Sequence, residues 1–317
     1  MILQSGEMAQ FREVVQHPAI LRAGKGVLLM FLLLLPQVLV ERTPFPLFIL
    51  AGQSNASGFG VKGVSMQAKL ESERRLWLWY LQGDPRWPLT ASRWVVLGGE
   101  VHRGLPSVGA ELTLGTRLAS LLHSDLGIIK VAFDGTSLGQ SPGADWNVSS
   151  NELFGQLLGQ VAMAMDALPS HLEPVLCGFF WMQGESDAVA GNGQPALAEG
   201  YGKNLRDLVI ALRQALARPG LPVIIARISP PAVDRRGRRF PFRGQVRRGQ
   251  TEVAQALEQM AVIDTRGLPR QADDLHFTAE AQQQLGLRFA RAWWRLRHDE
   301  GASPGPVPAT GSPAAGG

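Results

Sequence analysis

The chain has 317 residues, of which 45% are hydrophobic and 18% charged, so it can bury a sizeable core and global disorder is excluded. Its formal net charge of +4 is too small to indicate a nucleic-acid-binding protein. The only cysteine, Cys177, excludes an intrachain disulfide and a metal cluster built from several cysteines.

Residues 1–45 form a predicted N-terminal leader with an apolar segment. Residues 27–35 are uninterrupted apolar and follow Arg22 and Lys25. This run is shorter than the roughly 20 residues of a spanning helix and suits the core of a secretory signal, although no A-x-A-like cleavage site follows it. We therefore favour secretion, or membrane association through residues 26–40, over a cytoplasmic location. A buried helix and a start assigned too far upstream are the alternatives.

Between residues 46 and 297, short apolar runs alternate with segments of helical spacing. The apolar runs predict five strands, at residues 46–52, 128–135, 174–181, 222–228 and 261–264. Helical spacing predicts helices at residues 111–124, 152–167, 197–217, 245–259 and 278–297. Repeated strand-then-helix order is typical of an α/β fold, with a central five-stranded parallel sheet covered on both faces. Functional sites of such sheets lie in loops beyond the carboxyl ends of the strands.

The C-terminal segment, residues 298–317, consists mainly of Gly, Pro and Ala without apolar periodicity. It can bury too little surface to offset its chain entropy, so we predict a disordered tail. The folded domain is therefore expected to span residues 46–297.

A serine follows the first predicted strand, in the turn AGQSNASGFG at residues 51–60. Ser54 thus lies at the carboxyl end of a strand, where a nucleophile would sit. A hydroxyl is a weak nucleophile until a base takes its proton, so Ser54 alone establishes no activity. The alternative is that Ser54 and Asn55 cap the following helix.

One histidine has an acid placed to orient it. Asp273 precedes His276 by three residues, just before the helix that begins near Thr278. This spacing lets the carboxylate reach Nδ1 while Nε2 points outward as a general base. Asp274 is the second candidate for the orienting acid. These acids and Thr278 could instead cap the last helix, and both interpretations can hold together.

A further polar turn follows the third predicted strand, in FFWMQGESDA at residues 179–188. The amide of Gln183, or consecutive backbone N–H groups of this turn, could stabilise a developing oxyanion. The alternative is that Glu185 and Asp187 cap the next helix.

Five segments occur in an order that resembles the SGNH-hydrolase superfamily. They are GQSN (52–55), VGAEL (108–112), VAFDGTSL (131–138), WMQGESD (181–187) and DDLHFTAEAQQQLG (273–286). More narrowly, they are similar to its carbohydrate-esterase branch, which contains acetylxylan esterases and sialate O-acetylesterases. The resemblance covers most of residues 46–297 and implies a three-layer α/β/α, flavodoxin-like domain. It also implies a serine esterase that removes O-acetyl groups from carbohydrate without a metal or other cofactor.

The same resemblance assigns catalytic roles. Ser54 is implied to be the nucleophile, His276 the base and Asp273 the acid that orients it. The oxyanion hole is implied to consist of the backbone N–H groups of Ser54 and Gly109, with Gln183 as a third donor.

Three neighbouring residues, Gln53, Asn55 and Glu185, are expected to support the serine turn. Two positions depart from the family pattern. Ala110 stands where proline is usual, which leaves the preceding glycine N–H available. Asp134 stands where glycine is common and brings an extra carboxylate near the pocket, which bears on substrate preference.

Seven arginines fall within residues 234–248. Such a density could bind an anion, for example a uronate or sialate carboxylate, although a solvated basic loop is the simpler account. Aromatic residues do not alternate with these arginines as nucleic-acid platforms require, so we expect no nucleic-acid partner.

Trp77, Trp79, Trp87 and Trp94 cluster in a region that resembles an insertion before Gly109. Exposed indoles could stack on sugars and form a glycan subsite, and ordinary packing tryptophans are the alternative. We expect Trp146 at the rim of the pocket.

Two rival functions stay open at this stage. One is a non-catalytic glycan-binding module on the same fold, and an intact Ser, His and Asp set argues against it. The other is a membrane-associated acyl hydrolase of another ester class, which a comparison of acetyl with long-chain esters would separate. The sequence predicts no oligomeric state.

Overall fold

The computed structural model describes residues 42–59, 75–86, 88–97, 109–189, 191 and 195–298. The chain divides after Arg42, and the unit that begins at Thr43 holds every helix and strand of these ranges. The apolar run at 27–35, most of the tail and Trp87 lie outside the described residues. No helix in the described ranges is long and apolar enough to cross a membrane.

The described chain alternates strands and helices. The strands are β1 (Thr43–Gly52), β2 (Leu76–Gly83), β3 (Leu89–Val96), β4 (Leu126–Phe133), β5 (Leu172–Met182), β6 (Val223–Arg227) and β7 (Met260–Asp264). The helices are α4 (Ser54–Ser57), α5 (Glu111–Leu122), α6 (Leu153–Asp166), α7 (Glu185–Ala188), α8 (Ala196–Ala215), α9 (Arg243–Ala256) and α10 (Ala279–His298).

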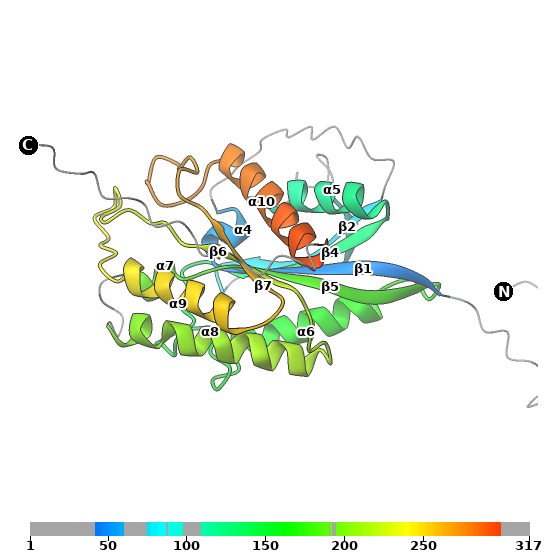
Figure 1. Cartoon of the computed structure of the whole chain (residues 1–317), viewed down its shortest axis with the longest axis horizontal. Coiled ribbons are helices and arrows are strands. Elements are labelled where there is room, and N and C mark those ends of the chain that lie inside the picture. Colours follow the sequence, from blue (N-terminus) through cyan, green and yellow to red (C-terminus); the bar gives the residue numbers. More distant parts are fainter. Residues whose placement is uncertain are drawn as a thin grey trace, which may run out of the picture. The chain divides into compact units, whose positions relative to one another are not determined.

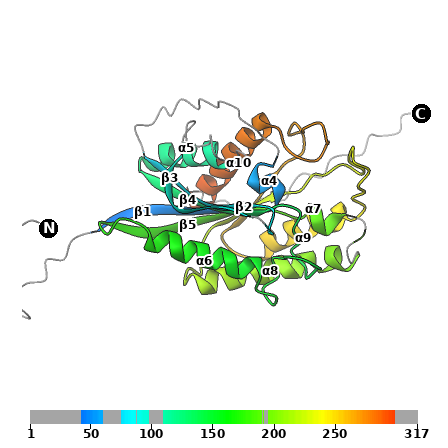
Figure 2. The same cartoon turned by 180° about the vertical axis from the view of Figure 1, so that it is seen from behind.

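One seven-stranded sheet, in the order β3-β2-β4-β1-β5-β6-β7, forms the middle layer. Helices α5 and α10 cover one face, and α6, α8 and α9 cover the other (Figures 1 and 2). All neighbouring strands are parallel except the edge pair β2 and β3. The predicted three-layer α/β/α class is therefore confirmed. The predicted count of five strands is too low.

The two missed strands, β2 and β3, lie in the tryptophan-rich region. In β2 the residues LWLWYLQG are apolar on both faces, because the strand lies inside the sheet between β3 and β4 and contacts α5 and α6 on its two faces. The indole of Trp79 donates to Gln160 Oε1 at 2.7 Å, and that of Trp94 donates to Ala164 O at 2.8 Å. Both acceptors belong to α6, so these indoles pack between the sheet and a helix. This contact favours the packing interpretation over a glycan subsite.

Aromatic side chains fill both sides of the sheet. On the α10 side, the ring centroid of Phe48 lies 5.2 Å from that of Trp293. On the opposite side, Trp146 and Trp181 meet edge to face at 5.1 Å. Trp146 is fully buried and its Nε1 donates to Thr136 Oγ1 at 2.9 Å. The expectation that Trp146 lies at the pocket rim is therefore wrong, because its ring fills the core beneath the loop that carries it.

Candidate active site

The serine turn is set by a close approach of two central strands. Gly52, the last residue of β1, has φ +144°, and a Cβ there would lie 2.0 Å from Met182 O of β5. Only glycine fits this approach, and the chain then turns so that Ser54 becomes the first residue of α4. Ser54 is therefore held at the carboxyl end of the central strand, as its place in the sequence predicts.

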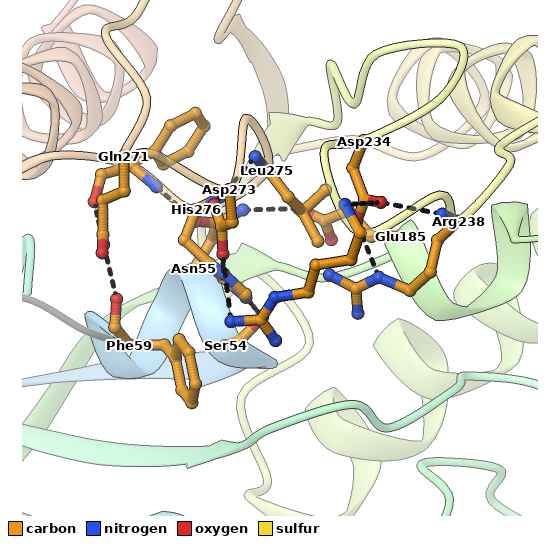
Figure 3. Close-up of polar contacts among 12 residues, drawn as sticks. Ser54, Asn55, Phe59, Glu185, Asp234, Arg238, Gln271, Asp273, Leu275 and His276 are labelled. Carbon is orange, nitrogen blue, oxygen red and sulfur yellow. Dashed lines mark hydrogen bonds and ion pairs between the residues drawn. The ribbon is translucent and has the colours of Figure 1, made fainter.

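Ser54 and His276 lie 222 positions apart in the chain and meet in the fold (Figure 3). The distance between Ser54 Oγ and His276 Nε2 is 3.1 Å. On the other side of the ring, His276 Nδ1 lies 2.5 Å from Asp273 Oδ2. The predicted proximity of these three side chains is confirmed, and they form a chain from carboxylate to imidazole to hydroxyl.

Asp273 also organises the loop that carries the histidine. Its Oδ1 accepts the backbone N–H groups of Leu275 and His276, both at 3.0 Å. Burial raises the pKa of this carboxyl, but the hydrogen bonds from the backbone and ring of His276 outweigh burial and bring it to about 2. The carboxylate is thus ionised at neutral pH and fixes the ring by two routes.

Asp274, the second candidate for the orienting acid, lies near Arg270, and Asp273 is the acid that contacts the His276 ring. The backbone of Asp274 has φ +61°, and its Oδ1 lies 3.8 Å from Arg270 Nη1. The capping alternative holds for Thr278, whose Oγ1 accepts the N–H of Ala281 at 3.2 Å in the first turn of α10. Capping and orientation are therefore divided between different residues of the same loop.

Asn55 joins three segments of the site. Its Nδ2 donates to Glu185 Oε1 at 2.8 Å, and its Oδ1 accepts the N–H of Phe277 at 3.0 Å. Glu185 is buried, and its Oε2 has no hydrogen-bond partner among the described residues. Burial raises the pKa of the Glu185 carboxyl. The hydrogen bond between Asn55 and Glu185 thus agrees with the expectation that these residues support the serine turn.

Gln53 ties the serine turn to the turn after β5. Its Oε1 accepts the backbone N–H groups of Gly184 and Ser186, at 3.2 and 3.3 Å. The Gln183 amide is fully buried and donates to Asp187 Oδ2 at 2.6 Å and to Thr136 O at 3.0 Å. In this geometry the prediction that Gln183 donates to an oxyanion is wrong, because internal acceptors use its N–H groups.

Gly109 is also placed differently from its predicted role. Its N–H donates to Glu111 Oε1 at 2.9 Å, and Gly109 does not line the cavity at Ser54. Glu111 in turn pairs with Lys130 at 2.9 Å, and Lys130 Nζ donates to Ser57 O at the end of α4. The assignment of Gly109 to the oxyanion hole is therefore wrong here, because a buried carboxylate holds its N–H.

Glu111 and Lys130 are site residues that the sequence analysis missed. Both side chains are 1% exposed or less. The available signal was a lysine inside IIKVAF, a run predicted to be a buried strand, since a buried charge requires a partner.

A cavity of about 720 Å³ opens at Ser54 and His276. Phe59 packs against the imidazole with ring centroids 4.4 Å apart. The remaining wall mixes apolar side chains, Val189, Phe240 and Leu275, with charged ones, namely Asp84, Arg86, Asp134, Glu185, Arg236 and Arg238. No group of three or more His, Cys, Asp or Glu side chains in the described ranges is arranged to hold a metal ion.

Part of the arginine-rich segment forms one wall of this cavity. Asp234 accepts the backbone N–H groups of Arg236 and Arg238 and pairs with the Arg238 guanidinium at 2.6 Å (Figure 3). The N–H of Arg235 donates to the carbonyl of Asp273 at 3.2 Å. This part of the segment is therefore an ordered loop attached to the histidine loop, and its four arginine side chains are exposed, as the simpler account of a solvated basic loop expects.

A doubly covered, mostly parallel sheet with Ser, His and Asp gathered at its carboxyl edge agrees with the class of SGNH hydrolases that the sequence resembles. The model of a family described as carbohydrate esterase, sialic acid-specific acetylesterase, matches residues 44–295. The chain therefore belongs to this family and is a carboxylic ester hydrolase of the carbohydrate acetylesterase type.

Individual relatives agree with this assignment. A probable carbohydrate esterase of Arabidopsis thaliana is 27% identical over 274 residues, covering 81% of this chain and 94% of its own. The solved structure of an Arabidopsis protein gives a TM-score of 0.60 at 25% identity, covering 79% of this chain and 98% of its own. A carbohydrate acetylesterase from Xanthomonas citri shares the fold, with a TM-score of 0.54 at 16% identity and coverage of 80% and 56%.

Proposed function

We propose that the protein removes O-acetyl groups from carbohydrate through an acyl-enzyme formed on Ser54. The observation that carries this proposal is the contact of 3.1 Å between Ser54 Oγ and His276 Nε2, with Asp273 behind the ring. A hydroxyl, a base and an orienting carboxylate in this order are the parts that nucleophilic acyl transfer needs.

The reaction follows from these positions. His276 Nε2 takes the proton of Ser54 while Oγ attacks the acetyl carbonyl carbon, and the carbonyl oxygen becomes an oxyanion. As the oxyanion collapses, the bond to the sugar oxygen breaks, and the imidazolium returns the proton to that oxygen. Water then attacks the acetyl-serine with the same base, which releases acetate and restores Ser54.

The oxyanion needs fixed donors, and the geometry suggests a revised set. Ser54 N–H, at the start of α4, has no acceptor among the described residues. The same holds for the N–H of Gly135 and for Nε2 of Gln53, and both residues line the cavity. We propose these three groups as the oxyanion donors in place of Gly109 and Gln183.

The charged side chains in the cavity wall support a carbohydrate as the alcohol part of the ester. Charged side chains such as Asp134, Arg236 and Arg238 line it, and a long acyl chain would have to remove water from them. We therefore expect turnover of acetyl esters and little turnover of long-chain esters.

The first test is Ser54→Ala, assayed with p-nitrophenyl acetate and with acetylated xylan. Turnover should fall by about 10³-fold or more, because the nucleophile is removed. The matched control is Ser170→Ala, an exposed serine outside the cavity, which should retain full activity. Undiminished turnover by a folded Ser54→Ala variant would refute the assignment.

A further inference from the structure

A second cavity adjoins the cavity at Ser54. It has a volume of about 430 Å³ and shares part of its wall with the first, namely Asp84, Arg86, Asp134, Gly135 and Ser186. Both cavities fall within the roughly 300–1,000 Å³ that ligand sites occupy. An acetyl group fills only a small part of the first cavity, so the sugar that carries it has room there. The second cavity is then left for a group beyond that sugar.

The far wall of the second cavity is an ordered loop. Ser137 Oγ and Ser141 Oγ are 2.6 Å apart, and Asp145 Oδ2 accepts the N–H of Ser141 at 3.1 Å. Thr136, on the same wall, is held by the buried indole of Trp146. These contacts hold the loop in place, so binding there requires little further ordering.

Asp134 stands where the two cavities meet. Its Oδ1 accepts the Ser57 hydroxyl at 2.7 Å, and its Oδ2 accepts no hydrogen bond from the described residues. Asp134 is partly buried, and burial raises the pKa of its carboxyl. Oδ2 is therefore available to accept hydrogen bonds from a ligand.

The charges of the second cavity indicate the kind of ligand. Arg86 pairs with Asp84 through two hydrogen bonds, at 2.7 and 3.0 Å, so these charges compensate each other. Asp134 is the charged residue of the described wall that has no ion-pair partner. An anionic group would be repelled by this carboxylate, whereas the hydroxyls of a neutral sugar would donate to it.

We propose that the second cavity binds an uncharged sugar unit next to the acetylated one, and that Asp134 accepts hydrogen bonds from its hydroxyls. This inference rests on the proposed function and makes the preferred substrate an oligosaccharide or polysaccharide rather than a monosaccharide. Asp134 is then a specificity-determining residue of the site.

The test compares kcat/KM for acetylated xylotriose and acetylated methyl xyloside, measured by acetate release. In the wild type, kcat/KM for acetylated xylotriose should be roughly ten times that for acetylated methyl xyloside. One hydrogen bond to a charged group can supply this factor. Asp134→Asn should reduce the ratio severalfold, because the amide is a weaker acceptor of the same size. Ala144→Phe should bring the ratio near one, because Ala144 lines only the second of the two cavities.

Matched controls lie on the surface of α6. Asp166→Asn and Ala162→Phe change exposed residues outside both cavities and should leave the wild-type ratio intact. Thermal unfolding of each variant identifies any that does not fold. If only Asp134→Asn folds, its kcat/KM ratio is sufficient to test the proposed second site.

Binding to the Ser54→Ala variant separates the two proposals. Calorimetry should show unacetylated xylotriose binding about tenfold more tightly than methyl xyloside, and Asp134→Asn in the same background should remove the difference. Equal binding and a wild-type ratio of one would overturn the second site while leaving the esterase intact. Absence of acetate release from every ester, with preferential xylotriose binding retained, would instead refute the proposed function.

Discussion

The carboxyl groups of the site differ in how many of their oxygens accept hydrogen bonds. Asp273 uses one oxygen for the imidazole and the other for two backbone N–H groups, so the acid that orients the base also shapes its loop. Glu185 is different, because one of its oxygens has no partner among the described residues. Such a carboxyl is easier to bury when protonated, and its raised pKa follows from this.

Glu185 therefore makes a pH-dependent contribution to stability. A carboxyl whose folded-state pKa is raised binds its proton more tightly in the folded protein, so its contribution is present below 4.5, the usual value, and is lost as pH rises through the raised pKa. Glu185→Gln removes this titration. The free energy of unfolding of the variant, relative to wild type, should rise with pH over that window and then level off. Urea unfolding of both proteins from about pH 4 to about pH 8 measures the difference.

The control for this prediction is Ser170→Ala, which changes an exposed residue without a titratable group. Its free energy of unfolding relative to wild type should stay constant over the same range. A constant difference for Glu185→Gln as well would show that the buried carboxyl does not titrate in this way.

At this scale the sequence predicted the positions of some side chains and not the contacts of others. Ser54, His276 and Asp273 were predictable because a strand-end turn and a spacing of three residues determine where these side chains lie. The directions of the Gly109 and Gln183 N–H groups were not, because they depend on acceptors such as Glu111 and Asp187, which reach them from other turns.

The one-turn helix α4 is too short to be stable by itself, so other elements must hold it. Lys130 of β4 donates to Ser57 O at the helix end, and Glu111 at the start of α5 fixes Lys130 from the other side. A fully buried ion pair contributes little net stability, but the loss of one partner leaves an uncompensated charge. We infer that the pair serves to place the helix that begins with Ser54.

Lys130→Met tests this placement. The variant should lose about 3–5 kcal/mol of unfolding free energy, because Glu111 stays buried without its cation. The double variant Lys130→Met, Glu111→Leu should regain most of this stability in urea unfolding. Its kcat should stay below that of wild type with KM less affected, because the hydrogen bond from Lys130 Nζ to Ser57 O is then lost. Full recovery of kcat in the double variant would show that the pair has no positioning role.

The elements themselves were predictable to different degrees. The five strands β1 and β4 to β7 were found because apolar runs end in turn residues. β2 and β3 were not, because the tryptophans of LWLWYLQG fitted an insertion equally well and polar residues interrupt the apolar run in LTASRWVV. Their pairing with β4 and with each other places them in the sheet, and this pairing is tertiary information.

Over the whole molecule, the site depends on segments from both ends of the domain. Ser54 follows β1, and His276 immediately precedes α10, which docks on the sheet through Trp293. The Trp293 ring meets Phe48 of β1 edge to face, and its Nε1 donates to Cys177 O of β5 at 2.8 Å. Docking of the last helix is thus a contact of the global core, and the imidazole can reach the serine only when that core is formed.

Trp293→Ala should therefore lower global stability without changing the chemistry. Loss of a buried tryptophan costs about 3–5 kcal/mol, so the urea midpoint should fall markedly. Trp293 does not line the cavity, and kcat/KM of the folded variant should match wild type. Because the site assembles only with the core, activity and far-ultraviolet circular dichroism should disappear at the same urea concentration in both proteins. Activity lost well before the circular dichroism signal would mean that the histidine loop opens locally, and the link between docking of α10 and the site would then fail.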